Sequence, residues 1–575
     1  MPRELVTNRF GLTLGELALL AAAFLGAALT LYAPALQGAF VSDDFHYLVN
    51  NAWLHELSLE NTLAILDPAG PTAINVVNYS PVQLLIHAVA WEVFGREPLG
   101  HHVINVCLHA LASLLLVLLF LRQGIPRAAA ALGGAFFLVH PANVEAVAWI
   151  SQLKSSSSLV LSLLALLAWP RRPLVGTLLF ALALLAKATA ACVLPVALLF
   201  EWSETGRVRW RFAVAAAVVL AAFSVAEFST HQRTGAAEAT LHETPLVLAR
   251  TVAALGLRYL VMAGTSWGVS AFHEPEPAHS PLDPWWLASL PVYALLTWRI
   301  VTLVRAQRGA AERSSSSKRS AQRAEGERSS TACSELAFWT WALVSFAPVS
   351  QLFPFLYPMA DRYLYFILPG LVGAVLLAGG EAAARLSLPP RAVAALGAIA
   401  CLALGVRAHE RTRIWRSSAT LNADAAEHYP DGTVASLLAA KRAAFAGDAD
   451  AALAALRRAV SRGYNRFDQL ETDAAWDAVR EDARFRDLVR EIAAGWIERS
   501  KRKASPTQTE LRVVAHAHVA RQEYTDALRV YEAAVAAGGP DSHAIRAEIE
   551  VVRTALASGN PNVRIRLGAT SPSQD

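Results

Sequence analysis

Apolar residues dominate the first two thirds of the chain, where they form long runs separated by short polar segments. The first run extends from Leu14 to Leu36, and similar runs recur up to about residue 408. About 20 apolar residues in a helix cross the hydrocarbon core of a bilayer, so these runs are long enough to be membrane spans. From residue 409 onward the chain is charged, alanine-rich and helical in the spacing of its apolar positions. The pattern predicts an all-α chain: a polytopic membrane domain, residues 1–408, then a helical domain outside the membrane, residues 409–558, and a disordered tail, residues 559–575.

Within the first domain, about eleven runs are predicted to span the membrane. They are residues 14–36, 101–121, 128–139, 144–169, 174–200 as two short helices that meet at Lys187, 212–229, 285–304, 336–353, 363–378 and 392–406. Two further runs are expected to lie along the membrane interface instead. Residues 80–94 are too few to span, and residues 245–263 contain Arg250 and Arg258.

Basic residues set the expected orientation, because Lys and Arg gather in cytoplasmic loops. Arg3 and Arg9 precede the first run, which we expect to remain as an anchor since no small-residue cleavage site separates it from Asp43. The loop from residue 37 to residue 80 contains no Lys or Arg, and we place it outside. Residues 305–334 are rich in Ser and Arg and are expected to form a disordered cytoplasmic loop. This arrangement leaves the second domain outside the cytoplasm.

The composition agrees with a membrane protein, since only 17% of the residues are charged, whereas soluble domains carry about a quarter. The net charge of +4 is too small to indicate a nucleic-acid partner, and no basic stripe alternates with aromatic residues. The four cysteines, Cys107, Cys192, Cys333 and Cys401, are scattered along the chain. They predict neither a disulfide nor a metal site.

The second domain contains two segments that resemble tetratricopeptide-type helix pairs. The first runs from Val434 to Arg462 and the second from Leu511 to Gly538, each with small residues where two helices would approach closely. Between them, residues 467–496 are helical in pattern but do not fit the repeat. The alternative is an alanine-rich helical bundle without repeat character.

Two adjacent carboxylates, Asp43 and Asp44, follow the first apolar run closely. Carboxylates at the mouth of a membrane helix are costly to keep there, which indicates a use for them. One carboxylate can act as the general base that removes a proton from an attacking hydroxyl. The other would raise the apparent pKa of the pair, hold the acceptor or hold a cation. The alternative is that both are solvated loop acids.

Two further segments place charged side chains next to apolar ones. On a helix that starts near Asn143, Glu145 and Lys154 lie about two and a half turns apart, so Lys154 sits within the apolar layer. A buried ammonium needs a partner, either a lipid phosphate or a helix dipole or carbonyl. Asp361 and Arg362 stand at the start of another span. Arg suits bidentate phosphate binding, although Arg and Tyr are also common interface anchors.

Taken together, these segments resemble the transmembrane and tetratricopeptide-repeat O-mannosyltransferase family and its bacterial relatives, which are glycosyltransferases of the GT-C class. The matching positions are Asp43, Asp44, Tyr47, Asn51, Tyr79, Pro81, Gly100, His102, Asn105, His109, His140, Pro141, Glu145, Ala146, Val147, Trp149, Lys187, Pro195, Asp361, Arg362, Tyr363 and Tyr365. The resemblance covers most of the chain in order and spacing. It implies a polyprenyl-phosphate-linked sugar donor, an active site outside the cytoplasm, a hydroxyl acceptor, and repeats that present the acceptor protein.

The resemblance also implies roles for individual residues. Asp43 and Asp44 would be catalytic, and Arg362, Lys154 and Lys187 would bind the donor phosphate. Further site candidates are Tyr47, Asn51, His140, Glu145, Asp361 and Tyr363.

Three departures from the family pattern stand out. Ser80 occupies the place of the family's usual Arg before Pro, and Leu153, Ser155 and Ser156 replace its basic and polar residues around Lys154. Both departures bear on phosphate binding. The second domain has fewer repeats than eukaryotic members have, so a lipid or glycan acceptor stays an alternative to protein.

These inferences predict an inverting glycosyltransferase that moves mannose or another hexose from a polyprenyl phosphate to a hydroxyl acceptor, a protein Ser or Thr, at the outer membrane face. For a bacterial relative, this means the inner membrane and a periplasmic second domain. We predict no resident cofactor and leave the need for a divalent cation open. One alternative is an inactive membrane-anchored scaffold. The other is a transporter of lipid-linked sugars, which would place charges or broken helices near the midplane.

Overall fold

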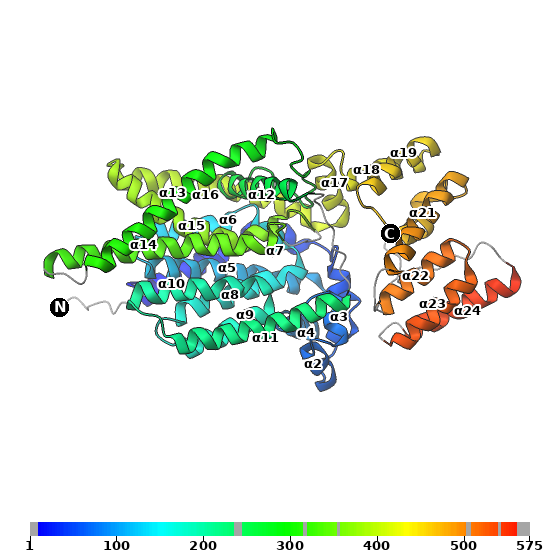
Figure 1. Cartoon of the computed structure of the whole chain (residues 1–575), viewed down its shortest axis with the longest axis horizontal. Helices are drawn as coiled ribbons and strands as arrows, with labels where there is room; N and C mark the ends of the chain where they lie inside the picture. Colours follow the sequence, from blue (N-terminus) through cyan, green and yellow to red (C-terminus); the bar gives the residue numbers. More distant parts are fainter. Residues whose placement is uncertain are drawn as a thin grey trace. The chain divides into compact units, whose positions relative to one another are not determined.

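The computed structural model describes residues 10–234, 244–313, 319–352, 357–501, 506, 508–538 and 542–559. Every regular element in these ranges is helical and none is a strand, so the all-α prediction is confirmed (Figure 1). Residues 1–9, which contain Arg3 and Arg9, and residues 560–575 of the expected disordered tail lie outside the described ranges. The chain divides into two compact units. One comprises residues 1–66, 79–227 and 238–421, and the other residues 67–78, 228–237 and 422–575.

The first unit contains the apolar helices of a multi-pass membrane protein. Nine described helices are long and apolar enough to cross a membrane: α1 (Leu14–Leu31), α5 (Pro98–Arg122), α8 (Leu153–Ala168) with the short η4 (Ile150–Gln152) before it, α11 (Trp210–Thr234), α12 (Pro245–Thr265), α13 (Pro284–Arg313), α14 (Arg319–Phe346), α15 (Asp361–Arg385) and α16 (Pro390–Thr412). Shorter helices lie between them: α2 (Leu59–Leu66), α4 (Pro81–Phe94), α6 (Arg127–Val139), α7 (Asn143–Ala148), α9 (Pro173–Ala186) and α10 (Val193–Thr205).

Three helices form the centre of this unit. Between 61% and 83% of the residues in the apolar windows of α5, α8 and α15 are buried, against 11% to 17% in α1, α11, α13 and α16. The peripheral helices therefore expose apolar faces that suit lipid. Helix α5 packs against α8, and α14 packs against α15 (Figure 1). The residues that begin α8 and α15 are consequently held by the most buried part of the bundle.

Glycine permits the close approach of α14 and α15. A Cβ atom at Gly370 would lie only 2.6 Å from the backbone nitrogen of Ala342, and one at Gly373 would collide with the ring of Phe338. Because a helix backbone can come this near only where its neighbour lacks a side chain, these two glycines hold α15 tightly against α14. Helix α15 carries Asp361 and Arg362 at its first turn.

Two sequence-based expectations in this unit differ from the described helices. The interfacial helix expected at residues 245–263 is α12, which is 21 residues long and apolar enough to span. Its charges do not prevent this, because the guanidinium of Arg250 donates to the carbonyl oxygens of Ala278 (3.1 Å) and His279 (2.7 Å). Arg258 lies over an indole ring. Each charge therefore has a partner near the end of the helix or along its side.

The disordered loop expected at residues 305–334 is the second correction. Helix α13 continues to Arg313 and α14 begins at Arg319, so the described residues of this segment are helical, while residues 314–318 lie outside the described ranges. Ala, Arg, Gln and Glu are good helix formers. Extending an existing membrane helix avoids the cost of a new nucleus, which explains why a polar, low-complexity sequence continues the helix.

The predicted break at Lys187 is confirmed. Helix α9 ends at Ala186, and Lys187 adopts an extended backbone with φ −162° and ψ 132°. A short 3₁₀ turn, η5 (Ala188–Cys192), then leads into α10. Lys187 therefore lies at the junction of two short helices and not inside one long helix.

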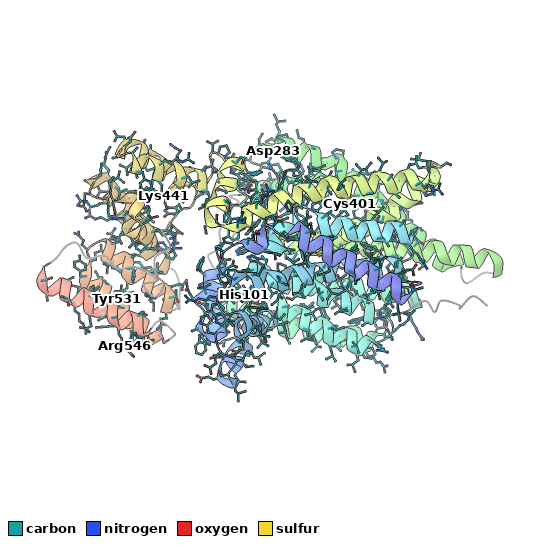
Figure 2. All side chains as sticks on the ribbon, turned by 180° about the vertical axis from the view of Figure 1, so that it is seen from behind. His101, Asp283, Cys401, Lys441, Tyr531 and Arg546 are labelled. Carbon is teal, nitrogen blue, oxygen red and sulfur yellow. The ribbon has the colours of Figure 1, made fainter. Side chains whose placement is uncertain are left out.

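The second unit contains consecutive helices after α17 (Ser418–His428). They are α18 (Thr433–Phe445), α19 (Ala449–Ser461), α20 (Phe467–Thr472), α21 (Ala483–Lys501), α22 (Gln508–Ala520), α23 (Tyr524–Ala537) and α24 (Ser542–Ser558), and the unit also includes α3 (Pro71–Val76). Helix α18 packs on α19, and α22 packs on α23, where both helix pairs were expected. Tyr531 of α23 is fully buried in the last apolar cluster (Figure 2). Their identification as tetratricopeptide repeats stays a prediction.

Candidate active site

The Asp43–Asp44 loop is attached to the start of α8 through Asp44. The buried carboxylate of Asp44 accepts hydrogen bonds from the backbone nitrogens of Val41 (2.9 Å) and Ser151 (2.7 Å) and from the Ser151 hydroxyl. Ser42 has φ +52°, a left-handed conformation that costs a non-glycine residue free energy. The loop therefore keeps a strained turn because the contacts of Asp44 hold it in place.

Burial raises the pKa of Asp44 to about 7, while the hydrogen bonds from Ser151 and Val41 oppose this shift. The charge of neighbouring Asp43 adds to the rise. A carboxyl group with this pKa changes its protonation state near neutral pH. Because its oxygens already accept three hydrogen bonds inside the protein, Asp44 supports the loop and has little capacity left for a substrate.

Asp43 has the opposite environment, since its side chain is exposed. Tyr357 lies near Asp43. The pKa of the Tyr357 phenol is raised first by burial and next by the charge of Asp43. Tyr357 in turn contacts the guanidinium of Arg362, which lies 5.1 Å from the centre of its ring. Of the two adjacent acids, Asp43 is thus the one whose oxygens are open to an incoming hydroxyl, beside the charged residues that begin α15.

Tyr47 and Lys154 connect the same loop to α8. Tyr47 lies in a turn of π-helix, η2 (Phe45–Val49), and such turns are frequent at functional sites. The ammonium of Lys154 donates to the Tyr47 hydroxyl at 3.0 Å, and the amide of Asn51 donates to the Tyr47 carbonyl oxygen at 3.1 Å. The ammonium of Lys154 therefore contacts the hydroxyl of Tyr47 and also lies over its ring, 4.7 Å from the ring centre, and these contacts include no carboxylate.

Lys187 has a similar contact, since its ammonium donates to the hydroxyl of Ser155 at 2.7 Å. Burial, together with the charges of Lys154 and Arg362, lowers the pKa of Lys187 well below its ordinary range, while Glu145 acts in the opposite direction. Lys154 and Arg362 thus both lie near enough to repel the charge of Lys187. An anion bound among them would remove that repulsion.

Arg362 and Glu145 form the ion pair of the site. The backbone nitrogen of Arg362 donates to Glu145 at 2.6 Å, and its guanidinium donates to the other carboxylate oxygen. The guanidinium also lies over the rings of Trp149 (5.5 Å) and Tyr363 (5.1 Å). Glu145 therefore fixes the position of Arg362 but neutralises only one of the three cations.

Two sequence-predicted residues serve the scaffold. His140 is buried, its Nδ1 accepts from the Ala142 backbone nitrogen, and its Nε2 lies 3.2 Å from the Ala263 carbonyl oxygen. This hydrogen-bond pattern assigns the proton to Nε2 and occupies both ring nitrogens. Asp361 is also buried and accepts from the backbone nitrogen of Ser270 and from His273. Both side chains are therefore engaged in contacts within the scaffold.

Sequence reasoning missed the residues that hold these side chains. Ser151 binds Asp44, Ser155 binds Lys187, and the Gln83 amide donates to the Ser151 carbonyl oxygen at 3.0 Å. Ser80, at the position of the family's usual Arg, donates to the Gln83 side chain at 3.0 Å. A run of serines in an apolar helix was the available signal for the residues of α8. Nothing in the sequence indicated His273 or Gln83.

Metal-ligand residues gather elsewhere. Within the described part of the chain, His518, Glu523 and Asp526 form the one group of three whose donor atoms lie within 4.8 Å of one another. They belong to the second unit, and Glu523 is already paired with His518 (2.7 Å) and Arg521 (2.8 Å). These contacts fit a surface ion-pair group better than a metal site.

Over part of its length the chain is similar to curated proteins. The chain is 33% identical over 179 residues to protein O-mannosyl-transferase Tmtc1 of Drosophila melanogaster, which covers 29% of this chain and 21% of that protein. It is 32% identical over 162 residues to protein O-mannosyl-transferase TMTC1 of Homo sapiens, which covers 26% and 18%. The chain thus matches about a fifth of the length of these relatives.

No protein-family model matches the chain. No solved structure matches it either. Its ordered motifs and its curated relatives point to the same group, and the chain resembles the transmembrane and tetratricopeptide-repeat O-mannosyltransferase family.

Proposed function

We propose that this protein is an inverting glycosyltransferase that moves mannose or another hexose from a polyprenyl-phosphate donor to a protein Ser or Thr hydroxyl at the outer face of the membrane. The observation that carries the proposal is an exposed carboxylate, Asp43, beside three cations with one acid between them. A base for the acceptor and a positive site for a phosphate are the two groups that this transfer requires. The printed names of the relatives describe the same class of reaction.

In the proposed reaction, Asp43 accepts the proton of the acceptor hydroxyl as its oxygen attacks the anomeric carbon. The bond from that carbon to the phosphate oxygen breaks, and polyprenyl phosphate leaves with one more negative charge. Lys154, Lys187 and Arg362 stabilise this developing charge, which makes their interaction stronger in the transition state than with the bound donor. A single displacement inverts the anomeric configuration.

Asp44 has a supporting role in this proposal. Its hydrogen bonds from Ser151 hold the loop on the start of α8. Lys154 lies in the first turn of that helix. Because Asp43 directly precedes Asp44 in the same turn, these contacts set the position of the base relative to the cations. Sequence reasoning had left the choice between the two acids open, and their burial now favours Asp43 as the base.

The membrane position and the second unit complete the proposal. Carboxylate and cations belong to segments that begin or interrupt apolar helices, where a lipid-linked phosphate can reach them while its polyprenyl chain remains in the bilayer. The helix pairs of the second unit would then recruit the acceptor protein, as in repeat proteins that bind extended chains on their surfaces.

The direct test is transfer from defined polyprenyl-phosphate sugars by the purified full-length chain, wild type against Asp43→Asn. Because Asn is nearly isosteric but cannot accept the proton, turnover should fall about a hundred- to ten-thousand-fold, with donor binding retained. Glu56→Gln, which removes an exposed acid from the same outer loop, is the matched control and should leave turnover unchanged.

Three results would contradict the proposal in different ways. Full activity of Asp43→Asn with an inactive Asp44→Asn would exchange the two roles. Full activity of the double variant would move the base elsewhere, with Glu145 as the next candidate. A wild-type protein that transfers nothing from any polyprenyl-phosphate sugar would favour an inactive scaffold.

A further inference from the structure

The loop between α12 and α13, residues 266–283, is unusually long for a connection without helix or strand. Such loops in compact domains are commonly functional or disordered. This one is ordered and partly buried, since Val269, Ala271, His273 and Ala278 are each at most 5% exposed. We refer to residues 266–283 as the strap.

The strap is attached at two places. Its second half is held on α12, where the Ala278 backbone nitrogen donates to the Thr251 hydroxyl at 2.9 Å and Arg250 donates to two strap carbonyl oxygens. Its first half is held on Asp361, the first residue of α15. The backbone nitrogen of Ser270 donates to Asp361 at 3.1 Å, and Nε2 of His273 lies 2.7 Å from the carboxylate.

The contact between His273 and Asp361 is fully enclosed, with side chains only 1% and 2% exposed. A buried carboxylate is expensive unless its hydrogen bonds are made, so this pair determines how the first turn of α15 can sit. The residue before it, Ala360, is held by the Tyr259 hydroxyl, which accepts from its nitrogen at 3.1 Å and donates to its oxygen at 3.3 Å. The start of α15 is therefore fixed from the strap and from α12.

Arg362 follows Asp361 directly, and its charge acts on Lys187 together with that of Lys154. Its backbone and guanidinium are both bonded to Glu145 of α7. The two consecutive residues are thus held by different partners. Arg362 is held by the buried carboxylate of Glu145, and the buried carboxylate of Asp361 is held by the strap. Both attachments hold the first turn of α15, and with it the position of the Arg362 guanidinium.

We propose that His273 is a positioning residue for the donor: by binding Asp361, it sets the geometry in which Arg362 meets the phosphate of a polyprenyl-phosphate sugar. This inference rests on the proposed function. His273 itself touches neither the phosphate nor the sugar in this proposal. A displacement of about 1 Å at a site of this kind can reduce the rate about a hundredfold.

The test compares His273→Leu with His273→Gln in the full-length protein in detergent. Leu removes the donor to Asp361, whereas the Gln amide can place a nitrogen near the position of Nε2. We expect His273→Leu to raise the donor KM and lower kcat/KM about ten- to a hundredfold. His273→Gln should keep most of the wild-type kcat/KM. His279→Gln, an exposed histidine of the same strap, is the control. A merely structural role would reduce the amount of folded enzyme without changing the KM of the folded fraction.

A second measurement separates this inference from the proposed function. Binding of a short-chain polyprenyl phosphate without sugar is measured for each variant by its effect on the melting temperature. If the wild type binds the lipid and transfers sugar but His273→Leu does the same with unchanged KM, the positioning role is wrong and the function stands. If the wild type neither binds nor transfers, both are wrong. Should His273→Leu fail to fold, His273→Asn, whose shorter side chain cannot reach Asp361, replaces it with the same expected result.

Discussion

The two ends of α8 carry opposite arrangements of charge. At its C-terminal end, Arg122 pairs with Glu204 at 2.6 Å, and Arg209 pairs with the buried Glu201. Arg122 also donates to the Leu167 carbonyl oxygen in the last turn of α8, and Arg209 donates to that of Pro170, just after the helix, at 2.9 Å. Each of these two arginines has its own carboxylate, and their remaining donors satisfy helix-end carbonyl groups.

At the N-terminal end of α8, three cations meet one ion-paired acid. Glu145 binds Arg362, whereas Lys154 and Lys187 donate to hydroxyls, and neither forms an ion pair with any carboxylate in the described part of the chain. A balanced group of charges is what a scaffold needs. Two partly buried ammonium groups without an ion-paired carboxylate are costly unless an anion binds to them, which suits a ligand site.

The largest expected effect comes from removing one arginine at each end. Arg362→Ala should weaken donor binding by about 2 to 5 kcal/mol, because a charged partner of the phosphate is lost. Arg209→Ala should instead destabilise the fold by about 3 to 5 kcal/mol, since it leaves Glu201 buried and unpaired. Donor KM and melting temperature, measured for both variants, separate the two effects.

The comparison would break if the two variants behaved alike. If Arg362→Ala lowers only the melting temperature and leaves the KM of the folded fraction unchanged, Arg362 is an interface anchor. If Arg209→Ala raises the donor KM at unchanged stability, the charges at the C-terminal end of α8 take part in donor binding.

A smaller effect is expected for Lys187→Met, which should weaken donor binding but stabilise the protein without donor. A hydrogen bond to a charged group contributes about 1.5 to 3 kcal/mol, so the donor KM should rise about tenfold or more. The melting temperature without donor should increase, because a partly buried cation repelled by Lys154 and Arg362 is replaced by an apolar side chain of similar length. Such a trade between stability and activity is typical of binding sites.

Lys441→Met provides the matched control for Lys187→Met. Lys441 lies in the second unit and forms a half-exposed ion pair with Asp473 at 2.6 Å (Figure 2). An exposed pair contributes about 0 to 1 kcal/mol, so this variant should leave KM and melting temperature nearly unchanged. A decrease in melting temperature for Lys187→Met would show that Lys187 stabilises the fold without any ligand.

The last prediction concerns Asp44 and pH. Its pKa is about 7 in the folded protein and 3.8 as the ordinary value, so between these pH values the unfolded chain has released a proton that the folded chain still binds. The free energy of unfolding must therefore fall as pH rises from about 4 to about 7, by at most about 1.4 kcal/mol per pH unit, and become flat above that range.

Melting curves from pH 5 to pH 8 for the wild type and Asp44→Asn measure this effect. The variant should lose that part of the pH dependence, although its baseline stability falls because an amide nitrogen must face one of the donors from Val41 or Ser151. An identical pH slope in both proteins would show that Asp44 is already ionised at pH 5, and that its hydrogen bonds outweigh its burial.

Much of the fold followed from the sequence because helix position is a local property. Runs of apolar residues indicated the membrane helices, and basic residues on both sides of residues 174–200 indicated the break at Lys187. The same reasoning failed where local signals were weighed wrongly. Arg250 and Arg258 did not prevent a spanning length of α12, and the polar segment after α13 continued as helix. In both cases neighbouring structure satisfied or extended what the local pattern disfavoured.

The sequence by itself determined which residue types stand at the ends of the apolar helices: two adjacent acids, two lysines and an Asp–Arg pair. Only the tertiary structure decided what each of them does. Asp44 is buried by Ser151, 107 residues away, and Arg362 is held by Glu145 from 217 residues away. Burial and hydrogen-bond partners arise from such distant contacts. Asp43 and Asp44 therefore look equivalent in the chain, yet one is exposed and the other is enclosed by the fold.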